Sequence, residues 1–145
     1  MKKEKDFCTM AEISDEEYSS LEKTIFNIQN DFNAIIHNLI ILRKKIGLEN
    51  DWQMEQWWKN VSNFMAEHIS QTISFIENDC SSDEFYWLSE IFVDITEKQP
   101  SINFYNAAKE KLKTVENEEF QSSISVELEY MKEILGNTLI QKNHL

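Results

Sequence analysis

The chain has 145 residues, 41% of them hydrophobic, so it is long enough to bury the core of one domain. Its two glycines and one proline are too few for the turns of a sheet, and a formal net charge of −12 opposes binding to nucleic acid. We expect an all-α fold, an irregular antiparallel bundle of five or six helices, with residues 1–13 as a flexible N-terminal arm and residues 14–145 as a single helical domain.

The first helical segment is expected to begin after Ser14, which can form a capping box with Glu17. Apolar residues then recur at three- and four-residue steps until Gly47, a residue typical of a helix end. Asn30 or Asp31 would cap a second helix if the segment breaks there. The pattern therefore permits one long helix or two shorter ones.

Another helix is expected from residue 50 or 51 to about Asn78, again on the evidence of apolar residues at helical spacing. Trp57 fits the apolar stripe of this helix. Trp52 and Trp58 fall outside the stripe, so they either cover the end of the bundle or face a partner.

The following helix is expected to start with a second capping box, Ser81 with Glu84, and to stop before Pro100. Ser101 caps the next segment, and a last helix from residue 117 ends before Gly136. The positions expected in the core of these segments include Tyr18, Leu21, Ile35, Leu39, Trp57, Val61, Phe85, Leu88, Phe92, Ile95, Phe104, Ile124, Leu128 and Met131.

Residues that would support catalysis or cofactor binding do not occur in recognisable patterns. His37, His68 and His144 have neither zinc nor di-iron spacing, and two isolated glycines cannot form a phosphate loop. Cys8 and Cys80 are expected to be free thiols, and acidic neighbours of Cys80 oppose its thiolate. We therefore expect no enzymatic activity, no cofactor and no metal site.

Membrane insertion and export are not expected, because the chain has no apolar run of about 20 residues and no apolar region typical of a signal peptide. The expected location is the cytoplasm. Acidic residues instead dominate residues 51–100, which hold ten Asp or Glu against two Lys. Such a surface is either a solvated helix face or a docking site for a basic protein.

On one continuous helix Tyr86, Glu90, Asp94 and Glu97 would share a side, and Trp87 lies next to them. Aromatic residues beside acids favour the docking interpretation, since Tyr and Trp are enriched where binding energy concentrates in interfaces. An enzyme that uses the paired carboxylates of Glu90 and Asp94 with a metal ion is the third possibility.

The segment Trp87-Leu88-Ser89-Glu90-Ile91-Phe92-Val93-Asp94-Ile95, followed by Glu97-Lys98-Gln99, resembles a motif of helical bacterial immunity proteins. These proteins belong to polymorphic toxin and contact-dependent growth inhibition systems. Their pattern is Ser-Glu-x-Phe-Asp-Asp-Ile before a turn, and the likeness extends over about the C-terminal 60 residues. Val93 replaces the first Asp of the motif, and Pro100 departs from the pattern of the turn.

The resemblance implies an antitoxin, a protein that binds the C-terminal domain of its cognate toxin and blocks it. The acidic charge independently favours a basic partner, such as a nuclease that cuts RNA or DNA. The alternative is an acidic helical adaptor, or an inhibitor that mimics nucleic acid, unrelated to a toxin. The expected partner-binding residues are Asp83, Glu84, Tyr86, Trp87, Glu90, Asp94 and Glu97.

Overall fold

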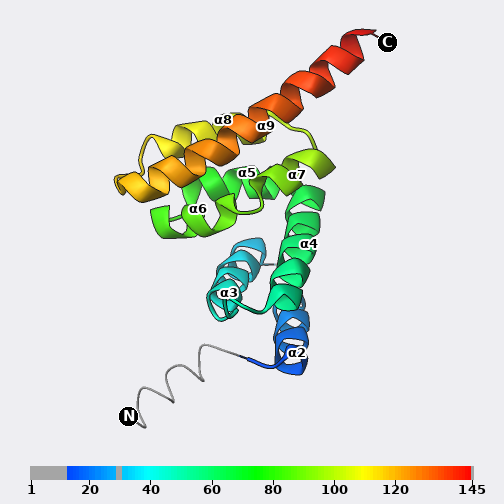
Figure 1. The fold of residues 1–145 in the computed structure, drawn as a ribbon, viewed down its shortest axis with the longest axis vertical. Coiled ribbons are helices and arrows are strands. Elements are labelled where there is room, and N and C mark those ends of the chain that lie inside the picture. Colours follow the sequence, from blue (N-terminus) through cyan, green and yellow to red (C-terminus); the bar gives the residue numbers. More distant parts are fainter. Residues whose placement is uncertain (1–12, 29–30, 145) are drawn as a thin grey trace. The chain divides into compact units, whose positions relative to one another are not determined.

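The computed structural model describes residues 13–28 and 31–144 of the chain (Figure 1). Every regular element in these ranges is an α-helix, which confirms the all-α class. The expected arm, residues 1–13, lies outside the described residues except for Ile13, and so does Cys8. In chain order the helices are α2 (Asp15–Phe26), α3 (Phe32–Lys44), α4 (Asp51–Glu67), α5 (Ile69–Asn78), α6 (Ser82–Ser89), α7 (Phe92–Lys98), α8 (Ile102–Leu112) and α9 (Glu118–His144).

The chain divides into two compact units, one up to Trp57 and one from Trp58 onward, and the boundary falls inside α4. The expectation of a single domain over residues 14–145 stays a prediction. The described residues hold eight helices instead of the five or six expected. The number is larger because three of the expected segments are each divided in two.

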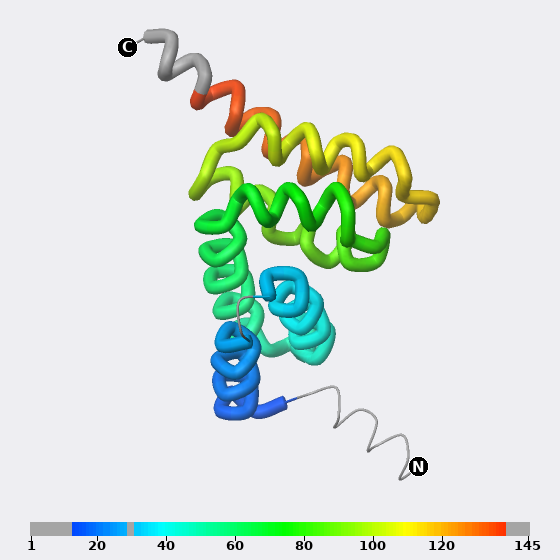
Figure 2. Tube along the Cα trace, turned by 180° about the vertical axis from the view of Figure 1, so that it is seen from behind, coloured from blue at the N-terminus to red at the C-terminus, as the bar shows by residue number. Residues whose placement is uncertain are grey.

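In the first unit α2 and α3 are separate helices (Figure 2), and local hydrogen bonds cap the start of each. The Glu17 N–H donates to Ser14 Oγ over 3.1 Å and the Ser14 N–H donates to Glu17 Oε1 over 3.3 Å, so the expected capping box is present. The Ala34 N–H donates to Asp31 Oδ1 over 3.1 Å, which caps α3. Of the two possibilities that the pattern left open, two shorter helices is the one observed.

The core of the first unit contains two large aromatic side chains whose polar atoms are hydrogen-bonded. Trp57 is fully buried and its Nε1–H donates to the backbone oxygen of Leu39 over 2.8 Å. Tyr18 is 1% exposed and its hydroxyl donates to Glu22 Oε2 over 2.6 Å. Leu21, expected in the core, is instead 40% exposed.

The expected helix to residue 78 is divided at His68, which separates α4 from α5. The Thr72 hydroxyl donates to the backbone oxygen of Met65 over 2.9 Å, and His68 Nδ1 lies 2.9 Å from the backbone oxygen of Phe64. At Met65 the Thr72 side chain takes the place of a helical backbone donor, whereas the Phe64 oxygen still accepts from the His68 N–H over 3.1 Å. The continuous helix predicted from the apolar spacing is therefore wrong at this point.

The expected helix from residue 82 to 99 is also divided, at Glu90 and Ile91 between α6 and α7. The Ile91 N–H donates to the Leu88 backbone oxygen over 3.0 Å, a bond of the tighter 3₁₀ type. The side chain of Ile91 is fully buried. Helical periodicity alone does not reveal this break, because the residue at the break is as apolar and buried as those of the stripe.

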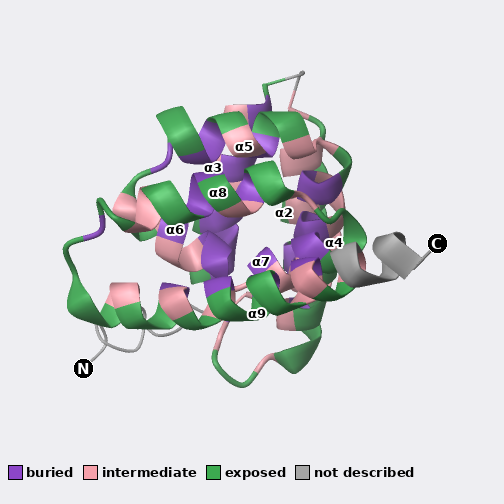
Figure 3. Ribbon diagram, turned by 90° about the horizontal axis from the view of Figure 1, so that it is seen from above, coloured by how far each residue is buried: buried purple, intermediate pink, exposed green. Residues whose placement is uncertain are grey.

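Helix α9 packs against α6, α7 and α8, while α5 packs against α8, and their buried residues form the core of the second unit (Figure 3). The aromatic rings of Phe85, Phe92 and Phe104 form a chain, with neighbouring ring centroids 5.4 and 5.2 Å apart. All three side chains are fully buried. They connect α6, α7 and α8, and therefore hold the short helices that carry most of the expected binding residues.

Helix α9 begins as expected but ends later. The Phe120 N–H donates to Asn117 Oδ1 over 3.0 Å, which caps the helix start. The expected end before Gly136 is wrong, because α9 continues to His144. Glycine inside a helix costs only about 1 kcal/mol relative to alanine. This cost does not stop a helix whose preceding residues are held by packing.

Candidate functional site

The first two expected binding residues lie in the first turn of α6. Glu84 completes the expected capping box, since its N–H donates to Ser81 Oγ over 3.1 Å and its Oε1 accepts from the Ser81 N–H over 3.0 Å. Asp83 is exposed next to it. Acidic side chains in a first turn also interact favourably with the helix dipole. Both residues therefore have a structural function at the start of α6.

Tyr86 and Trp87 lie one turn further along α6 and are half-buried. The Tyr86 ring stacks on Phe120 of α9, with centroids 4.2 Å apart and planes inclined by 11°. Trp87 meets Tyr86 edge to face, with centroids 5.8 Å apart. The stack of Tyr86 on Phe120 thus attaches α6 to α9, and both Tyr86 and Trp87 keep part of their surface accessible.

The expected stripe of Tyr86, Glu90, Asp94 and Glu97 on one helix is wrong, because the helix is divided at Glu90. Glu90 caps the end of α6, whereas Asp94 and Glu97 belong to α7. Glu97 is exposed near the end of α7. Helical spacing in the sequence therefore does not by itself place these four side chains on one face of one helix.

Three carboxylates nevertheless interact: Glu90, Asp94 and Glu127, which we call the acidic cluster. Burial raises the pKa of Glu127, and the charges of Asp94 and Glu90 raise it further. Burial also raises the pKa of Asp94, against a lowering by Lys98 and with a further increase from Glu97. The packing of α9 beside α6 and α7 therefore holds like charges close together in partly desolvated surroundings.

Glu90 is positioned by a tryptophan. The Trp58 Nε1–H of α4 donates to Glu90 Oε1 over 2.6 Å, and Trp58 is half-buried. A hydrogen bond to a charged acceptor is short and strong compared with one between neutral groups. Trp58 thus fixes one member of the acidic cluster, which explains its position outside the apolar stripe of α4.

A depression of about 170 Å³ lies between α6 and α9 beside this cluster. The rings of Tyr86 and Trp87 and the carboxylate of Glu90 line it from α6 and its end, and the carboxylate of Glu127 lines it from α9. An acidic hollow with aromatic walls suits a cationic side chain, which gains both charge pairing and contact with a ring face. The residues that line it are Tyr86, Trp87, Ser89, Glu90, Ser123 and Glu127.

The sequence prediction missed Glu127, Ser123, Phe120 and Trp58 at this site. Glu127 lies next to the buried Leu128 in α9, so its sequence position does indicate the edge of an apolar stripe. No local pattern indicates that this edge meets α6. Of the expected residues, the depression includes Tyr86, Trp87 and Glu90, whereas Asp83, Glu84 and Glu97 do not line it.

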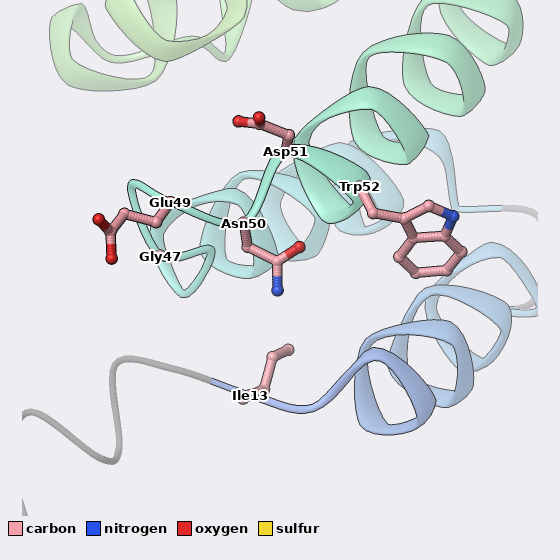
Figure 4. A pocket seen from close by; sticks show the side chains of 6 residues that line it. All are labelled: Ile13, Gly47, Glu49, Asn50, Asp51 and Trp52. Atoms are coloured by element: carbon pink, nitrogen blue, oxygen red, sulfur yellow. The ribbon is translucent and has the colours of Figure 1, made fainter.

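A larger depression, of about 470 Å³, occurs in the first unit at the start of α4 (Figure 4). Asn50 points toward Ile13 there, while Glu49 and Asp51 point away from Ile13 (Figure 4). The Ile13 backbone oxygen accepts from Gln53 Nε2 over 2.8 Å, so this segment is held against α4. Because its charged groups diverge, this depression is the weaker candidate despite its larger volume.

The other chemically notable groups do not form a site. Cys80 is buried, and burial together with the charge of Glu84 raises the pKa of its thiol to about 12, which opposes nucleophilic chemistry at neutral pH. Within the described ranges, no group of three His, Cys, Asp or Glu side chains is placed to hold a metal ion. The acidic cluster is thus not arranged as a metal site.

None of the helices in the described part of the chain combines the length and apolar character needed to cross a membrane. Searches of protein families, characterised proteins and solved structures found no match to this chain. The acidic cluster and its aromatic surroundings therefore have to be interpreted from their own chemistry.

Proposed function

We propose that this protein is an antitoxin that binds a basic bacterial toxin domain through the acidic cluster and the adjoining aromatic depression. The observation that carries the proposal is the depression between α6 and α9, where the carboxylates of Glu90 and Glu127 meet the rings of Tyr86 and Trp87. Partly buried like charges destabilise the isolated fold, and a cation from a partner would reverse that cost. A binding surface is the simplest reason for keeping them together.

A domain that cuts RNA or DNA has a positively charged groove for its substrate. An acidic surface of matching shape can occupy that groove, and complementary charge accelerates the association of the two proteins. The resemblance to immunity proteins involves Glu90 and Asp94, which are two members of the acidic cluster. Residue chemistry and resemblance thus support the same surface.

The test is co-expression with the C-terminal domain encoded immediately upstream of this chain, scored by cell survival and by co-purification. The proposal predicts that the chain restores growth and forms a stable one-to-one complex. If growth is not restored and no complex forms, the antitoxin function is wrong. A stable complex with a domain that is not toxic would instead favour the acidic adaptor.

A matched set of neutral variants locates the contact. Glu90→Gln, Asp94→Asn and Glu127→Gln remove the cluster's charge while preserving the size of the side chains, and Gln at position 90 can still accept from Trp58. Combined, they are expected to weaken binding by about tenfold or more. The exposed Glu77 of α5 provides the control. Glu77→Gln is expected to leave binding within about twofold.

A further inference from the structure

An exposed apolar pair on α9 is not explained by the core. Val126 and Tyr130 are 51% and 53% exposed, and they lie one helical turn apart. Neither side chain contributes to the buried stripe of α9, which contains Ile124, Leu128 and Met131. Large apolar side chains that recur on one side of a surface helix mark a potential contact area.

Tyr130 lies on the same side of α9 as the depression. Ser123 and Glu127 line that depression, and Tyr130 follows them at seven and three residues. Seven residues are almost two complete turns, so Ser123 and Tyr130 are nearly in line along the helix. Helical side chains also lean toward the N-terminus, which directs Tyr130 back toward Glu127. The aromatic ring thus extends the surface of the depression along α9.

Along this part of α9 the charges have one sign. No Lys or Arg occurs between Lys113 and Lys132. Glu119, Glu129 and Glu133 are all exposed on α9. The spacing of seven residues places Glu119 and Glu133 on the same side of the helix as Val126. The apolar pair is therefore framed by acidic side chains, an arrangement that a basic surface would complement.

We infer that Val126 and Tyr130, with Glu119 and Glu133 beside them, form the docking face of α9, and that Tyr130 inserts into an apolar hollow bordered by Lys or Arg on a basic protein. This inference rests on the proposed function and identifies its apolar anchor. Tyrosine is among the residues most enriched at interface positions that dominate binding energy. A second copy of this chain would place like charges opposite one another, and nucleic acid or an anionic membrane would do the same.

The experiment is a titration of the purified upstream-encoded domain with the wild-type chain, Tyr130→Ala and the control Ile102→Ala. Ile102 lies on α8 and is 49% exposed, so it matches Tyr130 in exposure. We expect Tyr130→Ala to raise the dissociation constant about tenfold or more, while Ile102→Ala stays within about twofold. Thermal unfolding of each variant verifies that both remain folded.

A second readout is hydroxyl-radical footprinting of the wild-type complex, which measures how accessible each aromatic side chain is. Oxidation of Tyr130 is expected to fall when the domain binds, whereas oxidation of Tyr105 on α8 is expected to stay unchanged. If the wild type binds while Tyr130→Ala binds equally well and Tyr130 remains oxidisable, the docking face is wrong and the proposed function stands. Absence of wild-type binding overturns the proposed function, and the docking face with it.

Discussion

Trp57 and Trp58 are neighbours in α4, yet they act in different regions of the molecule. Trp57 is fully buried in the first unit and donates to a backbone oxygen, that of Leu39. Trp58 is half-buried in the second unit and donates to a carboxylate, that of Glu90. The first bond completes a core, whereas the second positions a charged group. The two neighbouring tryptophans thus have different roles, since Trp57 belongs to a core and Trp58 holds a carboxylate of the candidate site.

The largest effect is expected from removing the tryptophan of the core. Trp57→Ala should lower the free energy of unfolding by about 3–5 kcal/mol, because it leaves a cavity and removes the hydrogen bond to the Leu39 oxygen. Urea denaturation followed by circular dichroism measures this loss. Trp52→Ala is the control, since Trp52 is 44% exposed, and its loss should be about 1 kcal/mol or less. Equal losses for the two variants would contradict the assignment of Trp57 to the core.

The two capping boxes provide a matched pair, one in each unit. Ser14→Ala and Ser81→Ala each remove a side-chain acceptor at a helix start, and each should lower the free energy of unfolding by about 1 kcal/mol. Ser122→Ala, at an exposed position inside α9, should have no measurable cost. A negligible loss for Ser81→Ala would show that α6 does not depend on its cap.

Trp58→Phe tests the tryptophan of the site. The ring is retained but the donor to Glu90 is lost, so the free energy of unfolding should fall by only about 0.5–1 kcal/mol at this half-buried position. Binding of the upstream-encoded domain should weaken, because Glu90 is no longer held in place. Trp57→Phe should show the opposite balance, a larger loss of stability without a loss of affinity. If Trp57→Phe and Trp58→Phe weaken binding equally, the distinction between the two tryptophans is wrong.

The smallest effect is expected from Glu127→Gln. The pKa of Glu127 is raised in the folded chain, so the folded state binds more protons than the unfolded state and its stability falls as pH rises through that pKa. The variant should therefore be slightly more stable than the wild type near pH 7, and the difference should vanish at about pH 4. Urea midpoints measured across this pH range test whether the variant is the more stable protein. A lower stability of the variant than of the wild type at neutral pH would contradict the prediction.

The helix starts could be predicted from the sequence because their causes are local. Ser14, Asp31, Ser81 and Ser101 each accept a hydrogen bond from a backbone N–H three residues later. The burial of most apolar positions on the predicted stripes could be predicted as well, because helical periodicity is also a local property of the sequence. The all-α class and most helix starts followed from these patterns.

The interior breaks and the acidic cluster could not be predicted in this way. The break at His68 depends on the Thr72 hydroxyl, which bonds to Met65 seven residues earlier. The cluster depends on how α9 packs, because Glu127 meets Glu90 only through tertiary structure. Two of its three carboxylates were expected, whereas the third and the positioning Trp58 were not.

The central claim is that a cation of the partner occupies the acidic cluster. Titration calorimetry at several pH values between about 4 and 7, repeated in buffers with different ionisation enthalpies, measures the protons released when the upstream-encoded domain binds. An approaching cation lowers the raised pKa values of Asp94 and Glu127. We predict net proton release that decreases in Glu127→Gln and is unchanged in Glu77→Gln. Binding without proton release, or with proton uptake, would contradict the claim.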